Sequence, residues 1–215
     1  MNRPYDAVIF DMDGTILDSM GYWRKLNADF LAARGLEAPE EIRADLMSTS
    51  NRVCARLYAT KLGLDMTPEQ VLAEYRARMA VYYQNDILPK PHIAQYLSWL
   101  TDQGISVCVG TASPQSLALP ALARHHLLEK FAFVASAFDL QMKKELPGFY
   151  EYIADKLGVP CDRCVMFEDA LYAMKGAKLA GMQVYGIADP IQQPYQAEIR
   201  ALCDRYIHDY AELMI

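Results

Sequence analysis

Four carboxylates, a hydroxyl and a lysine follow short apolar segments of the sequence. They are Asp11, Asp13, Thr111, Lys144, Glu168 and Asp169. In an open α/β sheet the ligand binds beyond the carboxyl ends of the strands, so we expect these side chains to converge on one edge of a sheet. Carboxylates gathered in one place repel one another unless a cation joins them. Their hard oxygen atoms suit Mg²⁺, which usually also binds waters and a substrate phosphate.

The two aspartates near the start of the chain, Asp11 and Asp13, lie two residues apart. A carboxylate can attack phosphorus and form an acyl phosphate that water then cleaves. With Asp11 as the nucleophile, Asp13 would protonate the leaving oxygen and then activate water. Lys144 would offset charge on the transferring phosphoryl group, and Thr111 would donate its hydroxyl and backbone N–H to phosphate oxygens. The set therefore predicts phosphoryl transfer.

Several of these residues also have a purely structural interpretation. Asp-rich turns commonly cap helices or bind solvent. Thr111 would then N-cap the helix that follows it, and Glu168 with Asp169 would cap the helix that begins near residue 170. We interpret Asp18 and Ser19 as hinge or capping residues rather than catalytic ones.

The apolar segments alternate with amphipathic segments of helical periodicity. Apolar segments that predict buried strands lie at 7–10, 105–109, 131–135, 164–167 and 184–187. Helical patterns lie at about 93–103, 115–128, 148–157 and 170–180. Strands that alternate with helices favour an α/β fold, with a parallel sheet and helices on both of its faces.

Residues from about 18 to 86 interrupt this alternation, because they contain no strand pattern. Amphipathic helices are predicted there near 22–34, 39–47, 52–62 and 68–85. Two joints flank this helical block, Leu17–Met20 before it and Ile87–Pro91 after it. The prolines of the second joint stop the preceding helix. The chain therefore divides into an α/β core of residues 1–17 and 88–215 and a helical domain of residues 18–87.

Composition and charge set limits on the partners of this chain. Of its 215 residues, 53% are hydrophobic and 22% are charged, which excludes disorder as the main state. The net charge of −6 argues against nucleic acid binding, which needs clustered Lys and Arg. No apolar segment approaches the ~20 residues that cross a bilayer, and the N-terminus lacks the apolar core of a signal peptide. We expect a cytoplasmic protein without a membrane partner; the sequence does not distinguish a monomer from a dimer.

The five cysteines include one pair at short spacing. Cys161 and Cys164 have the CxxC spacing of a redox pair or of half a zinc site. No second CxxC or histidine pair accompanies them, so a zinc site would lack half of its ligands. We interpret these residues as reduced thiols in a loop.

Four segments resemble the four signature motifs of the haloacid dehalogenase (HAD) superfamily, in the order of that family. Phe10–Ser19, with the sequence FDMDGTILDS, resembles the first motif of the phosphatase branch. Val109–Ser113 resembles the second motif, Lys144–Pro147 the third and Phe167–Ala170 the fourth. The motifs spread over nearly the whole chain, and the pattern is similar to the helical-cap branch of β-phosphoglucomutase-like and phosphoglycolate phosphatase-like hydrolases.

The resemblance implies a Rossmann-like core with a mobile helical cap inserted after the first strand, Mg²⁺ as the cofactor, and an aspartyl-phosphate intermediate on Asp11. Asp13 would be the general acid and base, since relatives that cleave carbon–halogen bonds lack this second aspartate. The implied metal ligands are Asp11, Asp13 through its backbone carbonyl, Glu168 and Asp169. The implied phosphate-binding residues are Thr111, Ala112 and Lys144.

One position departs from the family pattern. The third motif usually continues with aspartate after the proline, and this chain has Gly148 there. The missing carboxylate would have oriented Lys144, and the adjacent Lys143 competes with it for the same role. We assign the role to Lys144 from its spacing to Pro147 and from the resemblance.

Substrate specificity is expected in the helical cap. The candidate residues are Tyr22, Trp23, Arg24, Asn27 and Arg52, with the rest of segment 48–52. We expect a Mg²⁺-dependent phosphatase acting on a small phosphorylated metabolite, first a sugar phosphate, with a nucleotide or phosphoglycolate left open. One alternative is a sugar-phosphate mutase, whose closest examples carry histidine near the position of Trp23. The other is a non-catalytic phosphometabolite sensor on an inherited fold.

Overall fold

The computed structural model describes residues 4–38, 40 and 51–214 and divides into two compact units. One unit contains the residues up to Met20 and from Ile87 onwards, and the other comprises Gly21–Asp86. Apart from residue 40, the helix predicted near 39–47 lies outside the described residues. No described helix has the length and hydropathy that a membrane span requires.

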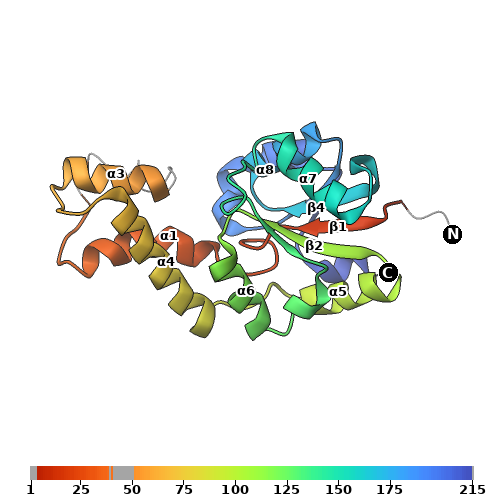
Figure 1. Cartoon of the computed structure of the whole chain (residues 1–215), viewed down its shortest axis with the longest axis horizontal. Coiled ribbons are helices and arrows are strands. Elements are labelled where there is room, and N and C mark those ends of the chain that lie inside the picture. Colours follow the sequence, from red (N-terminus) through yellow and green to blue (C-terminus); the bar gives the residue numbers. More distant parts are fainter. Residues whose placement is uncertain (1–3, 39, 41–50, 215) are drawn as a thin grey trace. The chain divides into compact units, whose positions relative to one another are not determined.

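A six-stranded parallel sheet forms the centre of the larger unit (Figure 1). The spatial order of its strands is β3-β2-β1-β4-β5-β6. The strands are β1 (Ala7–Phe10), β2 (Ser106–Thr111), β3 (Val134–Ser136), β4 (Cys164–Glu168), β5 (Gln183–Ile187) and β6 (Arg205–Ile207). The predicted α/β fold is confirmed. β6 was not predicted, because a three-residue strand at the sheet edge, beginning with an exposed arginine, is too short to form an apolar segment in the sequence.

Helices cover both faces of this sheet, so its central strands are apolar on both sides. In Figure 1, α7 and α8 lie on one face, and α5 and α6 lie on the other. The helices of this unit are α5 (Ile93–Asp102), α6 (Gln115–Arg124), α7 (Pro147–Leu157), α8 (Leu171–Leu179) and α9 (Gln196–Leu202). Short 3-10 helices occur at η1 (Leu128–Lys130), η2 (Cys161–Arg163), η3 (Pro190–Tyr195) and η4 (Tyr210–Leu213).

Alternate residues of β1 fill two separate apolar layers. Ala7 and Ile9 belong to the cluster that contains the buried side chains of α7 and α8. Phe10 stacks on Phe167 with ring centroids 4.9 Å apart, because the two residues are partners in the β1–β4 register. Tyr96 of α5 packs edge-on against Phe10. The two layers hold the carboxyl ends of β1 and β4 side by side, where the first and fourth motifs begin.

The two joints lie against each other within the larger unit. The backbone N–H of Asp18 donates to the carbonyl of Leu88 at 2.9 Å, and that of Lys90 donates to Ile16 at 2.8 Å. This pairing fixes both joints to the loop that follows β1.

The smaller unit is helical, with α3 (Asn51–Lys61), α4 (Pro68–Asn85) and most of α1 (Met20–Ala32). α4 begins with a capping box, in which Thr67 and Gln70 exchange side-chain and backbone hydrogen bonds. The ring of Phe30 stacks on Tyr58 at a centroid distance of 5.1 Å. Aromatic packing of this kind gives the helical unit its own core.

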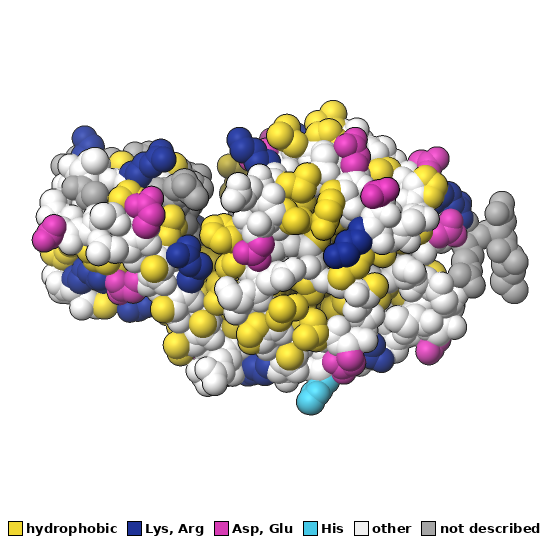
Figure 2. All heavy atoms as spheres, in the orientation of Figure 1, with side chains coloured by type: hydrophobic (Ala, Val, Ile, Leu, Met, Phe, Trp, Pro, Cys, Tyr) yellow, Lys and Arg dark blue, Asp and Glu magenta, His cyan; other side chains and the backbone are white. Residues whose placement is uncertain are grey.

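Charged side chains of both signs are interspersed on the face that Figure 2 shows, as far as the described residues go. This distribution differs from the clustered Lys and Arg of nucleic acid binding proteins.

Candidate active site

Lys144 joins two carboxylates at the carboxyl edge of the sheet. Its Nζ donates to Oδ1 of Asp11 and to Oε2 of Glu168, each at 2.6 Å. All three side chains are buried. Asp11 follows β1 and Glu168 ends β4, so neighbouring parallel strands bring the two carboxylates together. Without Lys144 the two negative charges would be buried next to each other with no cation between them.

A third carboxylate completes an acidic cluster. Ligand oxygens of Asp11, Glu168 and Asp169 all lie within 4.8 Å of one another. Asp169 packs against the turn after β1, where Gly14 adopts a φ of +85°. A Cβ at Gly14 would lie 2.6 Å from Oδ2 of Asp169, so only glycine fits there. Three buried carboxylates at this separation suit a hard divalent cation.

The electrostatics of the cluster favour such a cation. Burial raises the pKa of Asp11 to about 8, with a further contribution from Glu168, while Lys144 opposes the rise. Burial, followed by the charges of Glu168 and Asp11, also raises the pKa of Asp169 well above its usual range. Burial alone would lower the pKa of Lys144, but the charges of Asp11 and Glu168 outweigh it and raise that pKa. A bound divalent cation would replace protons on these carboxylates.

Both carboxylate oxygens of Asp13 accept hydrogen bonds from serine hydroxyls. Ser19 Oγ donates to its Oδ1 at 2.6 Å, and Ser113 Oγ donates to its Oδ2 at 2.7 Å. Ser19 lies in the first joint and Ser113 in the loop after β2. The carboxylate of Asp13 is therefore fixed beside Asp11 without being one of the three clustered carboxylates. The sequence did not predict this role for either serine.

Thr111 is the last residue of β2 and Ala112 begins the loop after it, so both lie at the same edge of the sheet. Thr111 is buried, and its Oγ1 accepts the backbone N–H of Ser113 at 3.0 Å. Ala112 is exposed. α6 begins at Gln115 and has no side-chain cap, so Thr111 does not serve as its N-cap.

Neither carboxylate of the fourth motif caps α8. The helix begins after Ala170 without a side-chain cap. Oε1 of Glu168 instead accepts the backbone N–H groups of Asp169 and Ala170, at 3.2 and 3.1 Å. These bonds orient Glu168 so that its other oxygen faces Lys144.

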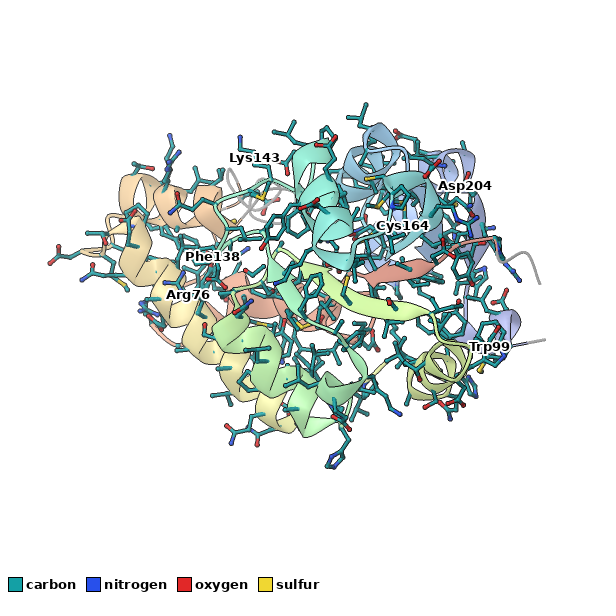
Figure 3. The ribbon with its side chains drawn as sticks, turned by 45° about the vertical axis from the view of Figure 1, so that its right-hand side comes forward. Arg76, Trp99, Phe138, Lys143, Cys164 and Asp204 are labelled. Atoms are coloured by element: carbon teal, nitrogen blue, oxygen red, sulfur yellow. The ribbon has the colours of Figure 1, made fainter. Side chains whose placement is uncertain are left out.

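The two adjacent lysines differ completely in environment. Lys144 is 2% exposed, whereas Lys143 is exposed to solvent (Figure 3). Tyr150 of α7 fixes the backbone at Lys144, because its hydroxyl donates to that carbonyl at 2.9 Å. Gly148 lies in the first turn of α7 and has no side chain with which to contact Lys144.

The candidate residues of the cap have different surroundings. Tyr22 packs its ring against Tyr82 at 5.2 Å, and Arg24 is exposed. Trp23 Nε1 donates to the hydroxyl of Tyr83 at 3.2 Å. The side chain of Arg52 lies outside the described residues, as does segment 48–50.

Asn27 belongs to a polar network inside the helical unit. Its Oδ1 accepts the hydroxyl of Tyr58 at 2.8 Å and also the hydroxyl of Tyr75. Its Nδ2 donates to the sulfur of Cys54 at 3.4 Å. These partners give Asn27 a structural role in the cap.

Three residues that the sequence did not single out connect to the site. Nε2 of Gln192, in η3, donates to Oδ2 of Asp169 at 3.2 Å. Asp189, the N-cap residue of η3, forms an ion pair with Lys90 at 2.8 Å. Asp189 follows β5, so the rule that residues after strands form the site would have found it. No motif or spacing pointed to Gln192 or Lys90.

The CxxC cysteines show no sign of a reactive pair. Figure 3 shows Cys164 among the strands and helices of the core. Burial raises the pKa of Cys164 to about 12, and burial also raises the pKa of Cys161. Raised values disfavour the thiolate, which is the reactive form of cysteine. All five cysteines are free thiols.

The motif resemblance is confirmed by comparison with known proteins. The family model of haloacid dehalogenase-like hydrolases matches residues 5–181. The chain therefore belongs to the haloacid dehalogenase-like hydrolase family.

Two curated relatives and one solved structure extend this result. The fructose-1-phosphate phosphatase YqaB of Escherichia coli K12 is 28% identical over 187 residues, covering 87% of this chain and 98% of the relative. Hexitol phosphatase B of the same organism is 28% identical over 189 residues, covering 87% of this chain and 85% of the relative. The crystal structure of CbbY from Rhodobacter sphaeroides in complex with phosphate matches with a TM-score of 0.79 and 23% identity, covering 97% of this chain and 96% of that chain. This last likeness is one of fold.

Proposed function

We propose that this chain is a Mg²⁺-dependent phosphatase that hydrolyses the phosphomonoester of a small metabolite, first of all a sugar phosphate. The observation that supports it best is the buried Asp11–Lys144–Glu168 arrangement, with Asp13 two residues from Asp11. This arrangement provides a nucleophile, a cation for the phosphoryl group and a second carboxylate for proton transfer. The curated relatives named above are phosphatases of sugar and hexitol phosphates, which supports this substrate class.

In the first step, a carboxylate oxygen of Asp11 attacks phosphorus and the bond from phosphorus to the substrate oxygen breaks. The leaving alkoxide takes a proton from Asp13, and an aspartyl phosphate remains on Asp11. In the second step, Asp13 takes a proton from water as that water attacks phosphorus. The bond from the Asp11 oxygen to phosphorus breaks, inorganic phosphate leaves, and both aspartates return to their starting state.

Other residues of the site stabilise the charge that develops. The ammonium of Lys144 lies 2.6 Å from Asp11 and would offset negative charge on the transferring phosphoryl oxygens. Asp11, Glu168 and Asp169 would hold Mg²⁺, and the bound ion would neutralise phosphate charge as a Lewis acid. Ser19 and Ser113 keep Asp13 oriented through hydrogen bonds to both of its oxygens.

The mutase alternative has less support. Mutases that resemble this chain in the first motif carry a histidine in the cap near the position of Trp23. An indole has only an N–H donor and cannot act as a general base, and here that donor is bonded to Tyr83. The sensor alternative leaves the buried catalytic carboxylates and Lys144 without a function.

Release of inorganic phosphate tests the proposal. A panel of sugar phosphates, nucleotides and phosphoacids is assayed with Mg²⁺ and again with EDTA, and Asp11→Asn provides the blank. We expect Mg²⁺-dependent release that is absent from the blank, with sugar phosphates ranked first. Release that persists in Asp11→Asn would refute the nucleophile. Isomerised sugar phosphate that forms faster than free phosphate would establish the mutase, and tight binding without turnover would establish the sensor.

A further inference from the structure

Asp169 receives a hydrogen bond from a residue far along the chain. Nε2 of Gln192 donates to its Oδ2 at 3.2 Å. Asp169 is 1% exposed, and Gln192 is half-buried. Hydrogen bonds from surrounding residues fix the rotation of a metal-ligating carboxylate, and their loss typically weakens metal binding.

A short 3-10 helix places Gln192. In η3, the N-cap residue Asp189 accepts the backbone N–H of Ile191 through Oδ1 at 3.0 Å. The backbone N–H of Gln192 donates to the carbonyl of Asp189 at 3.1 Å. Asp189 therefore fixes the backbone from which the Gln192 side chain reaches Asp169.

Lys90 holds the second oxygen of Asp189. Its Nζ lies 2.8 Å from Oδ2 of Asp189, and the two side chains are 10% and 2% exposed. The same ammonium lies 3.4 Å from Oδ1 of Asp18. Since Lys90 belongs to the second joint and Asp18 to the first, a continuous series of contacts runs from both joints to Asp169.

We propose that Gln192 is a positioning residue for the metal ligand Asp169, and that the Lys90–Asp189 ion pair orients Gln192. The inference rests on the proposed function, because it takes Asp169 as a ligand of Mg²⁺. Gln192 acts only through Asp169. Its loss therefore changes the affinity for Mg²⁺ and leaves the chemistry at Asp11 intact once the ion is bound.

Gln192→Leu tests the first part, because leucine keeps much of the volume and removes the donor. The full-length protein is titrated with MgCl₂ alone in a calorimeter, without substrate. We expect the Kd for Mg²⁺ to rise by ~10-fold or more. Gln193→Leu is the matched control, since Gln193 is the exposed neighbour in the same helix, and it should keep the wild-type Kd. At saturating Mg²⁺, kcat and KM of Gln192→Leu should return to within about twofold of wild type, which a general structural defect would prevent.

Lys90→Met tests whether the Lys90–Asp189 ion pair orients Gln192. The test is whether the Kd for Mg²⁺ rises or falls. Loss of the ammonium leaves the charge of Asp189 uncompensated, and by Coulomb's law alone this would tighten Mg²⁺ binding. If the ion pair orients Gln192, the Kd rises instead. The rise should also be smaller in a Gln192→Leu background than in the wild type, because the two residues act in one series.

The outcomes separate this inference from the proposed function. Equal Kd values for Gln192→Leu and Gln193→Leu, with Mg²⁺ bound by the wild type, refute the role of Gln192 alone. Tighter binding by Lys90→Met, or effects that add fully in the double variant, refute the role of the ion pair. Absence of Mg²⁺ binding by the wild type removes the metal from the proposed function and overturns this inference with it.

Discussion

Replacing Gly14 with alanine tests the placement of Asp169, because the turn after β1 leaves no space for a side chain. Gly14 has a φ of +85°, and a Cβ there would lie 2.6 Å from Oδ2 of Asp169. An ordinary contact begins at 3.4 Å, so the two atoms must separate by about 0.8 Å. Asp169 follows a buried strand and cannot yield freely, and the displacement would reach the acidic cluster.

The substitution carries two separable costs. A left-handed backbone costs an L residue ~1–2 kcal/mol, and overpacking a buried site costs a further ~1–3 kcal/mol. Displacing a positioning group by about 1 Å can reduce a rate by ~10²-fold. We therefore expect Gly14→Ala to lower kcat/KM for phosphate release by about two orders of magnitude.

Gly181→Ala is the matched control. Gly181 has a φ of +84°, and no atom of the described residues lies within 4 Å of the Cβ position. The free energy of unfolding of Gly181→Ala, measured in urea, should fall by only the ~1–2 kcal/mol of the left-handed backbone, and the variant should keep wild-type activity. If Gly14→Ala shows the same kcat/KM as Gly181→Ala, the crowding of Asp169 against Gly14 does not govern activity and the reasoning is refuted.

Three further predictions concern single side chains. Lys144→Met should reduce phosphate release by ~10³-fold, since two buried carboxylates lose their cation, whereas Lys143→Met should keep the wild-type rate in the same assay. The affinity for Mg²⁺ should increase as the pH rises toward about 8, because the raised pKa of Asp11 obliges the ion to displace a proton. Calorimetry in buffers of different ionisation enthalpy should detect that proton, and a Kd independent of pH would contradict the prediction. Asn27→Ala should lower the free energy of unfolding by ~1–3 kcal/mol, because two tyrosine hydroxyls lose their common acceptor. Unchanged stability in urea, together with an altered substrate ranking, would instead show that Asn27 contacts the substrate.

The fold could be predicted because its core strands are buried on both faces. Such strands appear in the sequence as continuous apolar segments, as Cys164–Phe167 does. The helix predicted at 68–85 coincides with α4, because Pro68 directly follows the N-cap residue Thr67 and marks the start. β6 is short and lies at the sheet edge, where burial imposes little pattern, and it was missed.

The motif residues of the site could be predicted because parallel strands bring their carboxyl ends together. That rule needs only the strand positions, and it predicted that Asp11 and Glu168 lie at one edge of the sheet. The pairing of β1 with β4, which makes them neighbours, comes from the structure. Gln192 is different, because it reaches Asp169 from 23 residues further along the chain through a short 3-10 helix. Its position depends on the tertiary contact between Lys90 and Asp189, which lie 99 residues apart and share no local sequence signal.

The departure at Gly148 shows how the structure compensates for a missing motif residue. A carboxylate after Pro147 would orient the lysine of the third motif, yet Lys144 already donates to two carboxylates at 2.6 Å. The hydroxyl of Tyr150 fixes the backbone of Lys144. Both the backbone and the ammonium group of Lys144 are therefore held without a residue at position 148. Position 148 has space for a side chain, since among the described residues a Cβ there would contact only Met142, at 3.8 Å. Lys144 is therefore oriented by the two carboxylates whose charge it neutralises. An acidic residue at position 148 is not needed to orient it.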